Sequence, residues 1–481
     1  MTEAVAAVEE LKPIREAHGV IEKDRKLARI VVVDDVVAHP GADRLDLVII
    51  GGWQLCSTKG QYEKGQLAVY CEIDSLLPLS NVELFGFLEA RRSDNRRVNG
   101  ENYHRLKTIK LRKELSQGLL VPLPEKYKHL PVDTNLTLEL GILKYEPKPV
   151  KERDGNGAPG KSDWYGALVR RILRGLDGEL APWPGQLTKS DQDRVQNKTT
   201  AFNIAKDNQT SFEITWKLDG SSMTVFCIND KGIRTGVCSR NYELSLGDEA
   251  DWSFFDQVRH FVGAFMVRNR KIFRRAKTLQ PDGTWKTSLK WNGIHIPEWR
   301  KGPLAQENNF TTYVKQNEII QKLKAYHAET GEFITVQGEL VGPNIQSNYE
   351  GVEKNEFYVF SVFRNGNVEV LPDEAREIVA KLGLTYVPVL DDNYVIPAGT
   401  SVKEILAMAE GPRGLNPTKD TFREGLVFKA RHAVMSWKSI SNNYLLYKEK
   451  LEEKEAKAEE KAAAEAERLA AETETADTPV A

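Results

Sequence analysis

The sequence predicts an α+β protein, with a small β-barrel of the OB type at its N-terminal end and a larger mixed domain behind it. Short β-rich runs separated by turn residues fill residues 28–147, a pattern typical of a closed or partly closed barrel. A segment rich in Pro, Gly and charge at 148–189 has the composition of a linker. Beyond it, β-rich runs alternate with helical stretches up to residue 447.

The elements are expected in the following order. Residues 1–27 form a helical leader, which is acidic and lacks the basic start and apolar centre of a secretory signal. Turn residues such as HPGAD and KGQYEKGQ then separate the barrel strands. These strands are expected at 28–39, 44–52, 66–74, 120–127 and 133–147.

The second domain is expected at 190–447. A short amphipathic helix at 163–176 leads into it, and a longer helix occupies 313–330. The tail at 448–481 is rich in Ala, Glu and Lys and holds 6 Lys or Arg against 11 Asp or Glu. This composition predicts an exposed helix that frays into disorder.

Composition limits the class of protein. The chain has 481 residues, 41% hydrophobic and 28% charged, which indicates a globular protein of two or three domains. No apolar run is long enough to span a bilayer. The four cysteines lack paired metal spacing and are expected to be reduced intracellular thiols.

Charge is unevenly distributed along the chain. The net charge of −2 hides a block at 91–113 with 9 basic and 2 acidic residues. Such a block favours a localised site for a polyanion rather than general coating of nucleic acid.

The segment 216-WKLDGSSMTVF-226 carries the clearest chemical signal, because Lys217 follows a strand-like run and precedes an Asp-Gly turn. A single K-x-D-G is weak evidence, since surface turns produce it often. Five further motifs follow in the same domain: SRN at 239–241, GEL at 338–340, FYVFSVF at 357–363, EGLVFK at 424–429 and WKSISNNYLL at 437–446.

This ordered series resembles the covalent nucleotidyltransferase superfamily of polynucleotide ligases and mRNA-capping enzymes. The similarity is greatest to RNA ligases, and HPGADRLDLVIIGGWQ, HRLKTIKLRKELSQGLLVP and LTKSDQDRVQN resemble the Deinococcus-type RNA ligases that seal nicks. The resemblance implies an ATP-grasp-like nucleotidyltransferase domain of antiparallel sheets flanked by helices. It also implies that ATP and Mg²⁺ or Mn²⁺ are the cofactors.

The resemblance gives Lys217 the role of nucleophile that becomes lysyl-AMP. Such a lysine must lose its proton, and burial or nearby cations favour the neutral amine. Asp219 organises the nucleotide site, and Gly220 allows close approach of the backbone. Arg240 is expected to contact phosphate or ribose, and Glu339 the ribose hydroxyls or a metal-bound water.

Further contacts to the nucleotide follow from the later motifs. Glu424 is expected to hold the divalent metal, and Lys438 to contact the α-phosphate. Lys429 assists at the nucleotide in a role that the sequence does not define. Phe360 is placed against adenine, while Phe357, Tyr358 and Phe363 remain alternatives because aromatic residues at alternate positions also fill sheet cores.

Two positions depart from the pattern of the family. Trp216 stands before the nucleophile, where relatives often have a polar or acidic residue that contacts the purine. Ser436 stands two residues before Lys438, where a second lysine is common. One purine contact and one phosphate contact are therefore left unassigned.

The barrel is expected to bind the nucleic-acid strands that flank the nick, because OB barrels bind oligonucleotides on one face. The stretch HRLKTIKLRK alternates cationic and apolar residues, as a strand with one wet basic face would. The residues expected to contact nucleic acid are His104, Arg105, Lys107, Lys110 and Arg112.

The expected activity is the joining of a 3′-OH RNA end to a 5′-phosphate end, on nicked or broken RNA or an RNA/DNA duplex. A monomer without membrane association is expected, in the cytoplasm, although a nuclear or organellar location remains open. The alternatives are a capping guanylyltransferase, an ATP-dependent DNA ligase, and a binding protein with a degenerate transferase domain. The first two usually have an OB domain after the catalytic one, and a degenerate enzyme should have lost Lys217, Glu424 or Lys438.

Overall fold

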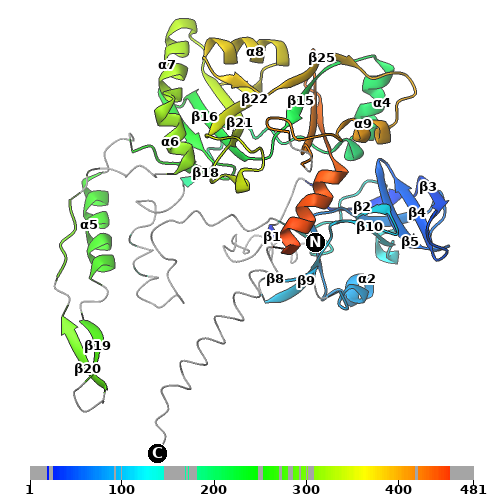
Figure 1. Ribbon diagram of the computed structural model, residues 1–481, viewed down its shortest axis with the longest axis horizontal. Helices are drawn as coiled ribbons and strands as arrows, with labels where there is room; N and C mark the ends of the chain where they lie inside the picture. The colour runs from blue at the N-terminus through cyan, green and yellow to red at the C-terminus, as the bar shows by residue number, and fades with distance from the viewer. Residues whose placement is uncertain are drawn as a thin grey trace, which may run out of the picture.

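The computed structural model describes most of both predicted domains (Figure 1). The described residues are 19–20, 25–91, 94–98, 100–145, 168, 172, 181–247, 253–269, 273–279, 285–291, 294–299, 301, 308–417 and 421–454. The predicted helix at 163–176 lies outside them except for residues 168 and 172, which are helical. The tail beyond residue 454 and most of the leader also lie outside them.

The N-terminal domain is built from short antiparallel strands, as expected for an OB barrel. Its sheets are β2-β6-β12, β3-β4-β5, β10-β11 and β1-β13-β7-β9-β8. Their bounds are Gly19–Val20 (β1), Ala28–Val32 (β2), Asp35–Ala38 (β3), Leu45–Ile50 (β4), Trp53–Thr58 (β5), Leu67–Cys71 (β6), Ser75–Pro78 (β7), Asn95–Val98 (β8), Glu101–Arg105 (β9), Thr108–Leu111 (β10), Glu114–Gln117 (β11), Leu119–Pro122 (β12) and Leu143–Tyr145 (β13).

Alternation along the strands creates two cores in this domain. In β6, Val69 and Cys71 pack on one side with Ile30 and Val121, while Tyr70 packs on the other side with Trp53 and Val48. Successive residues of a strand face opposite sides of the sheet, so β6 is buried on both faces. The short helix α2 (Val82–Phe85) covers the first core with Leu84 and Phe85.

Several local predictions in this domain differ from the structure. The strand expected at 28–39 is two strands, β2 and β3, in different sheets. Of the strand expected at 133–147, only β13 forms within the described residues, and the one expected at 120–127 ends with β12. Gly19–Val20, within the expected helical leader, form strand β1 and pair with β13. The basic stretch HRLKTIKLRK does not form one strand. It contributes the end of β9 and the whole of β10, which belong to different sheets, because the chain turns at Leu106 and Lys107.

The second domain contains a large sheet in the order β14-β18-β17-β16-β21-β22-β23, with β24 parallel to β22. Its other strand pairs are antiparallel, in agreement with the expected fold class. The strands are Ala181–Pro182 (β14), Ser221–Asn229 (β16), Ile233–Cys238 (β17), Tyr242–Leu244 (β18), Ile334–Val341 (β21), Glu356–Arg364 (β22), Val368–Glu369 (β23) and Thr385–Tyr386 (β24).

Three helices cover one face of this sheet: α6 (Asn309–Gln316), α7 (Ile319–Thr330) and α8 (Pro372–Lys381). The predicted helix at 313–330 is therefore two helices, because Glu318 adopts a left-handed backbone conformation with φ of 52°. Leu323 of α7 and Ile378 of α8 pack against Val336 and Val359 of the sheet.

A smaller antiparallel sheet, β25-β15-β26-β27, faces the other side of the large one. It consists of Val389–Val395 (β25), Ser211–Lys217 (β15), Gly425–Ala430 (β26) and Ser436–Ile440 (β27). Its outer face packs against α4 (Thr199–Asp207) and α9 (Val402–Met408) through residues such as Phe212, Ile214 and Trp437.

Because Phe212 and Ile214 point outward into that core, the alternate residues Thr215 and Lys217 point toward the large sheet. The functional motifs therefore lie between the two sheets of the second domain.

Two further elements lie outside these sheets (Figure 1). A segment between β18 and α6 contains helix α5 (Phe254–Arg268) and a hairpin of β19 (Phe273–Leu279) and β20 (Trp285–Trp291). A last helix, at 442–454, follows β27 and lies between the two domains. Among the described helices, none is long and apolar enough to cross a membrane.

Candidate active site

Lys217 is the last residue of β15 and lies beside Glu424, which immediately precedes β26. The two strands are paired so that Lys217 is opposite Gly425. Lys217 Nζ lies 2.7 Å from Glu424 Oε1, and both side chains are largely enclosed. The structure thus brings together the predicted nucleophile and the predicted metal ligand.

The charge of Lys217 is stabilised by its neighbours. Burial by itself lowers the pKa of a lysine, but the carboxylates of Glu424, Glu339 and Asp219 outweigh burial and raise the pKa of Lys217. Lys217 is therefore an ammonium ion in this arrangement. A second cation bound beside Glu424 would offset the carboxylate charge and so allow Lys217 to lose its proton.

Glu339, in β21 of the large sheet, lies across from Lys217. Burial, reinforced by the negative charges of Glu424 and Asp219, raises the pKa of Glu339 to about 8. Its Oε1 accepts a hydrogen bond of 3.1 Å from the backbone N–H of Gly220. A Cβ at Gly220 would lie 2.4 Å from the carbonyl oxygen of Leu340, so only glycine fits this close approach.

Asp219 is held by two residues that the sequence analysis did not single out. The Glu350 side chain accepts the Asp219 backbone N–H at 3.1 Å, and Lys448 Nζ lies 2.6 Å from Asp219 Oδ2. Glu350 is 1% exposed, and burial raises its pKa to about 7. No local sequence signal identifies these residues, because each reaches the turn from more than a hundred positions away.

Lys438 faces the same side of the small sheet as Lys217. It is opposite Val427, two residues along β26 from Gly425, and residues two apart share a face. Burial and the charge of Lys217 lower the pKa of Lys438 to about 8, although Asp191 opposes this effect. Lys438 Nζ lies 3.0 Å from Asp191 Oδ1.

Arg240 approaches the same aspartate from the loop after β17, with 3.8 Å between Arg240 Nη2 and Asp191 Oδ2. Desolvation would raise the pKa of Asp191, but Lys438 and Arg240 lower it to about 2. The two cations predicted to contact phosphate thus converge on one anionic group. Asp191 is the third residue that the sequence analysis missed.

The aromatic residues of β22 separate by face. Phe357 packs in the core under the helices, and Phe363 is 1% exposed. Phe360 and Tyr358 face the small sheet instead and pack in a cluster with Trp216 and Leu218. Phe360 and Tyr358 are therefore the two rings placed to meet a base, and the choice of Phe360 stays a prediction.

Trp216 belongs to the apolar wall of this site. It packs against the outer core of the small sheet and, at its other edge, against the cluster around Phe360. It also packs against Gly414, where a Cβ would lie 2.5 Å from the indole ring. The residue that departs from the family pattern therefore fills space beneath the site.

Lys429 lies farther along β26 and points between the sheets. Its Nζ donates to the Phe360 carbonyl and to Ser361 Oγ, both at 2.6 Å. Burial lowers its pKa. Lys429 is directly opposite Ser436, the position at which the family commonly has a second lysine. Its ammonium group, however, is hydrogen-bonded to β22.

The five residues predicted to contact nucleic acid occupy two different settings. Lys110 and Arg112 are exposed on the β10–β11 hairpin, which His39 braces through a 3.1 Å contact with the Leu111 carbonyl. His104 and Arg105 are buried. Arg105 and Lys107 are ion-paired to the helix at 442–454.

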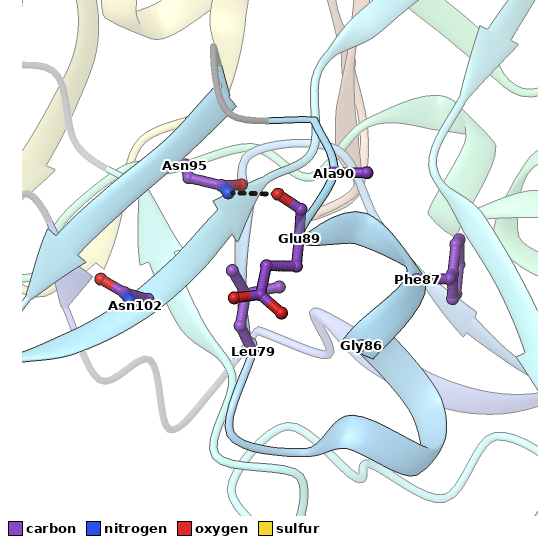
Figure 2. A pocket seen from close by; sticks show the side chains of 7 residues that line it. All are labelled: Leu79, Gly86, Phe87, Glu89, Ala90, Asn95 and Asn102. Atoms are coloured by element: carbon purple, nitrogen blue, oxygen red, sulfur yellow. Dashed lines mark hydrogen bonds between the residues drawn. The ribbon is translucent and has the colours of Figure 1, made fainter.

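His104 lies beneath a hollow of about 580 Å³ on the N-terminal domain. Asn95 lines this hollow with Phe87 and Glu89 (Figure 2), and its amide donates to the Glu89 carbonyl at 3.2 Å. The same side chain lies 3.0 Å from His104 Nδ1. Burial lowers the pKa of His104 to about 4, so this imidazole is neutral and supplies no cation to a nucleic acid.

The acidic residues around Lys217 fit a divalent cation. Glu424 and Glu339 offer the oxygen ligands that Mg²⁺ and Mn²⁺ prefer, whereas Asp219 is paired with Lys448. The raised pKa of Glu339 shows that its ionised form needs positive charge nearby. Within the described residues there is no ready-made cluster of three or more metal-binding side chains, so water and phosphate oxygens would complete the coordination.

Comparison with family models gave two matches. Residues 210–442 match a model described as RNA ligase, and residues 27–123 match a model described as an OB-fold domain. The first match spans all the motifs from Lys217 to Lys438. A comparison with curated protein sequences gave no match.

Solved structures of an RNA ligase from Naegleria gruberi are similar over most of both chains. An aspartate mutant without ligand has a TM-score of 0.62 and 26% identity, over 88% of this chain and 98% of that chain. A glutamate mutant with AMP and Mn has a TM-score of 0.62 and 27% identity, over 88% and 99%. A lysine mutant with ATP and Mn has a TM-score of 0.61 and 27% identity, over 88% and 99%.

Proposed function

We propose that this chain seals nicks in RNA-containing duplexes through a lysyl-AMP intermediate. The premise is that it carries an RNA ligase domain of the covalent nucleotidyltransferase superfamily behind an OB-fold domain. One observation carries the proposal: Lys217 ends a strand beside Glu424, with Lys438 on the same face. The Naegleria relatives with ATP and Mn support ATP as the nucleotide and Mg²⁺ or Mn²⁺ as the metal.

In the first step the neutral amine of Lys217 attacks the α-phosphorus of ATP. A P–N bond forms, the bond to the β-phosphate oxygen breaks, and pyrophosphate leaves. The amine must first release a proton, which the carboxylates around it oppose. Glu424 and Glu339 would hold the divalent cation, whose charge offsets theirs and so favours the neutral amine.

Phosphate charge is neutralised by Lys438 and Arg240 in this mechanism. Both side chains already converge on the carboxylate of Asp191, and the α-phosphate would exchange with that carboxylate as their partner. Fixed cations placed where charge develops lower the barrier to phosphoryl transfer. Adenine would lie against Phe360 or Tyr358, on the apolar wall that includes Trp216.

Two further transfers complete the joining. A 5′-phosphate oxygen attacks the α-phosphorus of lysyl-AMP, and Lys217 leaves as the amine. The 3′-OH of the neighbouring strand then attacks the adenylylated 5′-phosphate, and AMP leaves. Both steps depend on in-line geometry more than on acid–base groups, so a partner strand that aligns the two ends favours reaction at nicks.

Nick sealing tests this proposal directly. The protein, as a monomer, is incubated with ATP, Mg²⁺ or Mn²⁺ and a labelled duplex whose nick has a 3′-OH RNA end and a 5′-phosphate. Sealing is expected with the nicked duplex, and slower joining with the same strands unpaired. Lys217→Ala should fail with the 5′-phosphate but still seal a nick that carries a pre-adenylylated 5′ end, because the last step does not use the lysine.

The controls separate the competing outcomes. Lys450→Ala changes an exposed lysine and should seal like the wild type. A nick with a DNA 3′-OH end tests the preference for RNA. The proposal is wrong if nicked RNA duplexes are not sealed, or if Lys217→Ala seals them as well as the wild type.

A further inference from the structure

The helix at 442–454 connects the candidate active site to the N-terminal domain. It starts two residues after β27, which carries Lys438, and crosses beside the N-terminal domain (Figure 1). The sequence predicted that charged residues from Lys448 onward form an exposed tail. In the structure, the described part of that tail contacts both domains.

One side of the helix holds Asp219. Lys448 Nζ lies 2.6 Å from Asp219 Oδ2, and the Tyr444 hydroxyl interacts with the same carboxylate. Tyr444 and Lys448 are four residues apart, so they lie one above the other on the helix. Lys448 Nζ also lies over the ring of Tyr444, 5.6 Å from its centroid, which fixes the position of the ammonium group.

The adjoining face of the helix holds the N-terminal domain. Arg105 lies 3.1 Å from Glu449 and 2.5 Å from Glu452, while Lys107 lies 2.8 Å from Glu453. Nearer the start of the helix, the Gln117 amide donates to Asn442 Oδ1 at 3.1 Å. Glutamates three or four residues apart share a helix face, so these contacts form one continuous strip.

These ion pairs are better placed to stabilise than ordinary surface pairs, which contribute little because water screens them. The Arg105 side chain is 6% exposed, and its guanidinium stacks 3.7 Å above the ring of Tyr145. Asp219 is 12% exposed in its pair with Lys448. Removal of either partner would leave a charge with little access to water.

We infer that Lys448 is a positioning residue for lysine adenylylation, and that the helix at 442–454 couples the seating of the N-terminal domain to the turn that follows the nucleophile. Glu449 and Glu452 hold the helix against Arg105, the helix presents Lys448, and Lys448 fixes Asp219 two residues from Lys217. The inference rests on the proposed function, since its readout is adenylylation of Lys217.

The test measures the rate of label transfer from α-labelled ATP to the full-length protein, with the ATP concentration varied. Lys448→Met should lower the maximal rate by at least about 10-fold, equivalent to roughly 1.4 kcal/mol of lost transition-state stabilisation, with a smaller change in KM for ATP. Lys448→Arg should restore most of the rate, because it keeps the charge. The matched control Lys450→Met, on the same helix and exposed, should behave like the wild type.

Coupling is tested through residues that do not contact Asp219. The double variant Glu449→Gln, Glu452→Gln leaves Lys448 in place and should also lower the rate. Combined with Lys448→Met, it should lower the rate no further than Lys448→Met alone, because both changes break the same chain of contacts. Thermal unfolding of each variant identifies any change that acts by loss of folding.

The outcomes separate the two proposals. If the wild type takes no label from ATP, the proposed function is wrong, and the positioning role in adenylylation is wrong with it. If the wild type is labelled and Lys448→Met is labelled at the same rate, the positioning role is wrong. Additive losses in the combined variant would overturn the coupling while leaving the role of Lys448 intact.

Discussion

The ammonium group of Lys217 is surrounded by acidic residues. The sequence predicts that burial and nearby cations favour the neutral amine, and Lys438 does lie on the same face. In the structure, burial lowers the pKa of Lys217, but the charges of Glu424, Glu339 and Asp219 raise it by more. Lys217 therefore loses its proton only when another positive charge lies beside these carboxylates. Deprotonation of the nucleophile is thus coupled to binding of the metal.

The largely enclosed carboxyl group of Glu339 gives a prediction for stability. Its pKa is raised from 4.5 to about 8, mainly by burial, so the folded state binds this proton more tightly than the unfolded state. Above pH 8 the ionised carboxylate costs stability, whereas below pH 4.5 it does not. Glu339→Gln should therefore be more stable than the wild type by about 1 kcal/mol or more at pH 8–9.

This stability difference should shrink steadily as the pH falls from 8 toward 4.5, as measured by urea unfolding at several pH values. The control Glu329→Gln removes an exposed carboxylate and should show no such trend. A difference that is absent at pH 8, or that grows toward pH 5, would refute the account of Glu339.

Site residues that lie in sequence motifs could be identified from the sequence, but the residues that contact them could not. Lys217, Glu339, Glu424 and Lys438 lie in recognisable phrases, and the structure brings them to one site. Glu350, Lys448 and Asp191 act through contacts that form only when distant segments fold together. For a charged residue outside any motif, the sequence does not predict which distant segment it will contact in the folded protein.

At the scale of elements, the β10–β11 hairpin is the exposed part of the predicted basic surface. Lys110 and Arg112 are exposed there, whereas Arg105 and Lys107 are engaged by the helix at 442–454. The alternating pattern predicted one wet basic face. It could not reveal that acidic residues more than three hundred positions away would cover part of that face.

The double variant Lys110→Ala, Arg112→Ala should bind a nicked duplex more weakly. The dependence of log affinity on log salt concentration should become shallower by about 0.9 for each phosphate contact that is lost. Fluorescence anisotropy over a salt series measures both quantities. Adenylylation of Lys217 should not change, because in the part of the chain that the structure describes Lys110 and Arg112 do not contact the active-site residues. An unchanged affinity and salt slope would show that RNA binds elsewhere.

At the scale of the whole molecule, the two domains meet through buried and partly buried polar groups. The Trp53 indole donates to Asn197 Oδ1 at 2.8 Å, and the Asn197 amide donates to Glu72 Oε2 at 2.9 Å. Arg194 adds a contact of 3.4 Å with Asp74. The order of the two folds, an OB-fold domain followed by a domain of antiparallel sheets and helices, could be predicted from the sequence. Their mutual placement could not, because single polar residues at the interface have no sequence periodicity.

Asn197→Ala should destabilise the protein by about 1–3 kcal/mol, because the buried Trp53 N–H loses its acceptor and Glu72 Oε2 loses its donor. Glu72 Oε1 keeps its ion pair with Arg25. The exposed Asn203→Ala, in the nearby helix α4, should change stability little. Thermal unfolding monitored by tryptophan fluorescence distinguishes the two variants. Equal stability of Asn197→Ala and Asn203→Ala would mean that this interface contributes nothing.

The most direct test of the central claim is the covalent labelling of Lys217. The protein is incubated with α-labelled ATP or GTP and a divalent metal, denatured, and digested for mass spectrometry. We predict that label from ATP remains on the protein as AMP attached to Lys217, and that Lys217→Ala retains none. Label from GTP alone, AMP on another residue, or no covalent label with either nucleotide would contradict the account.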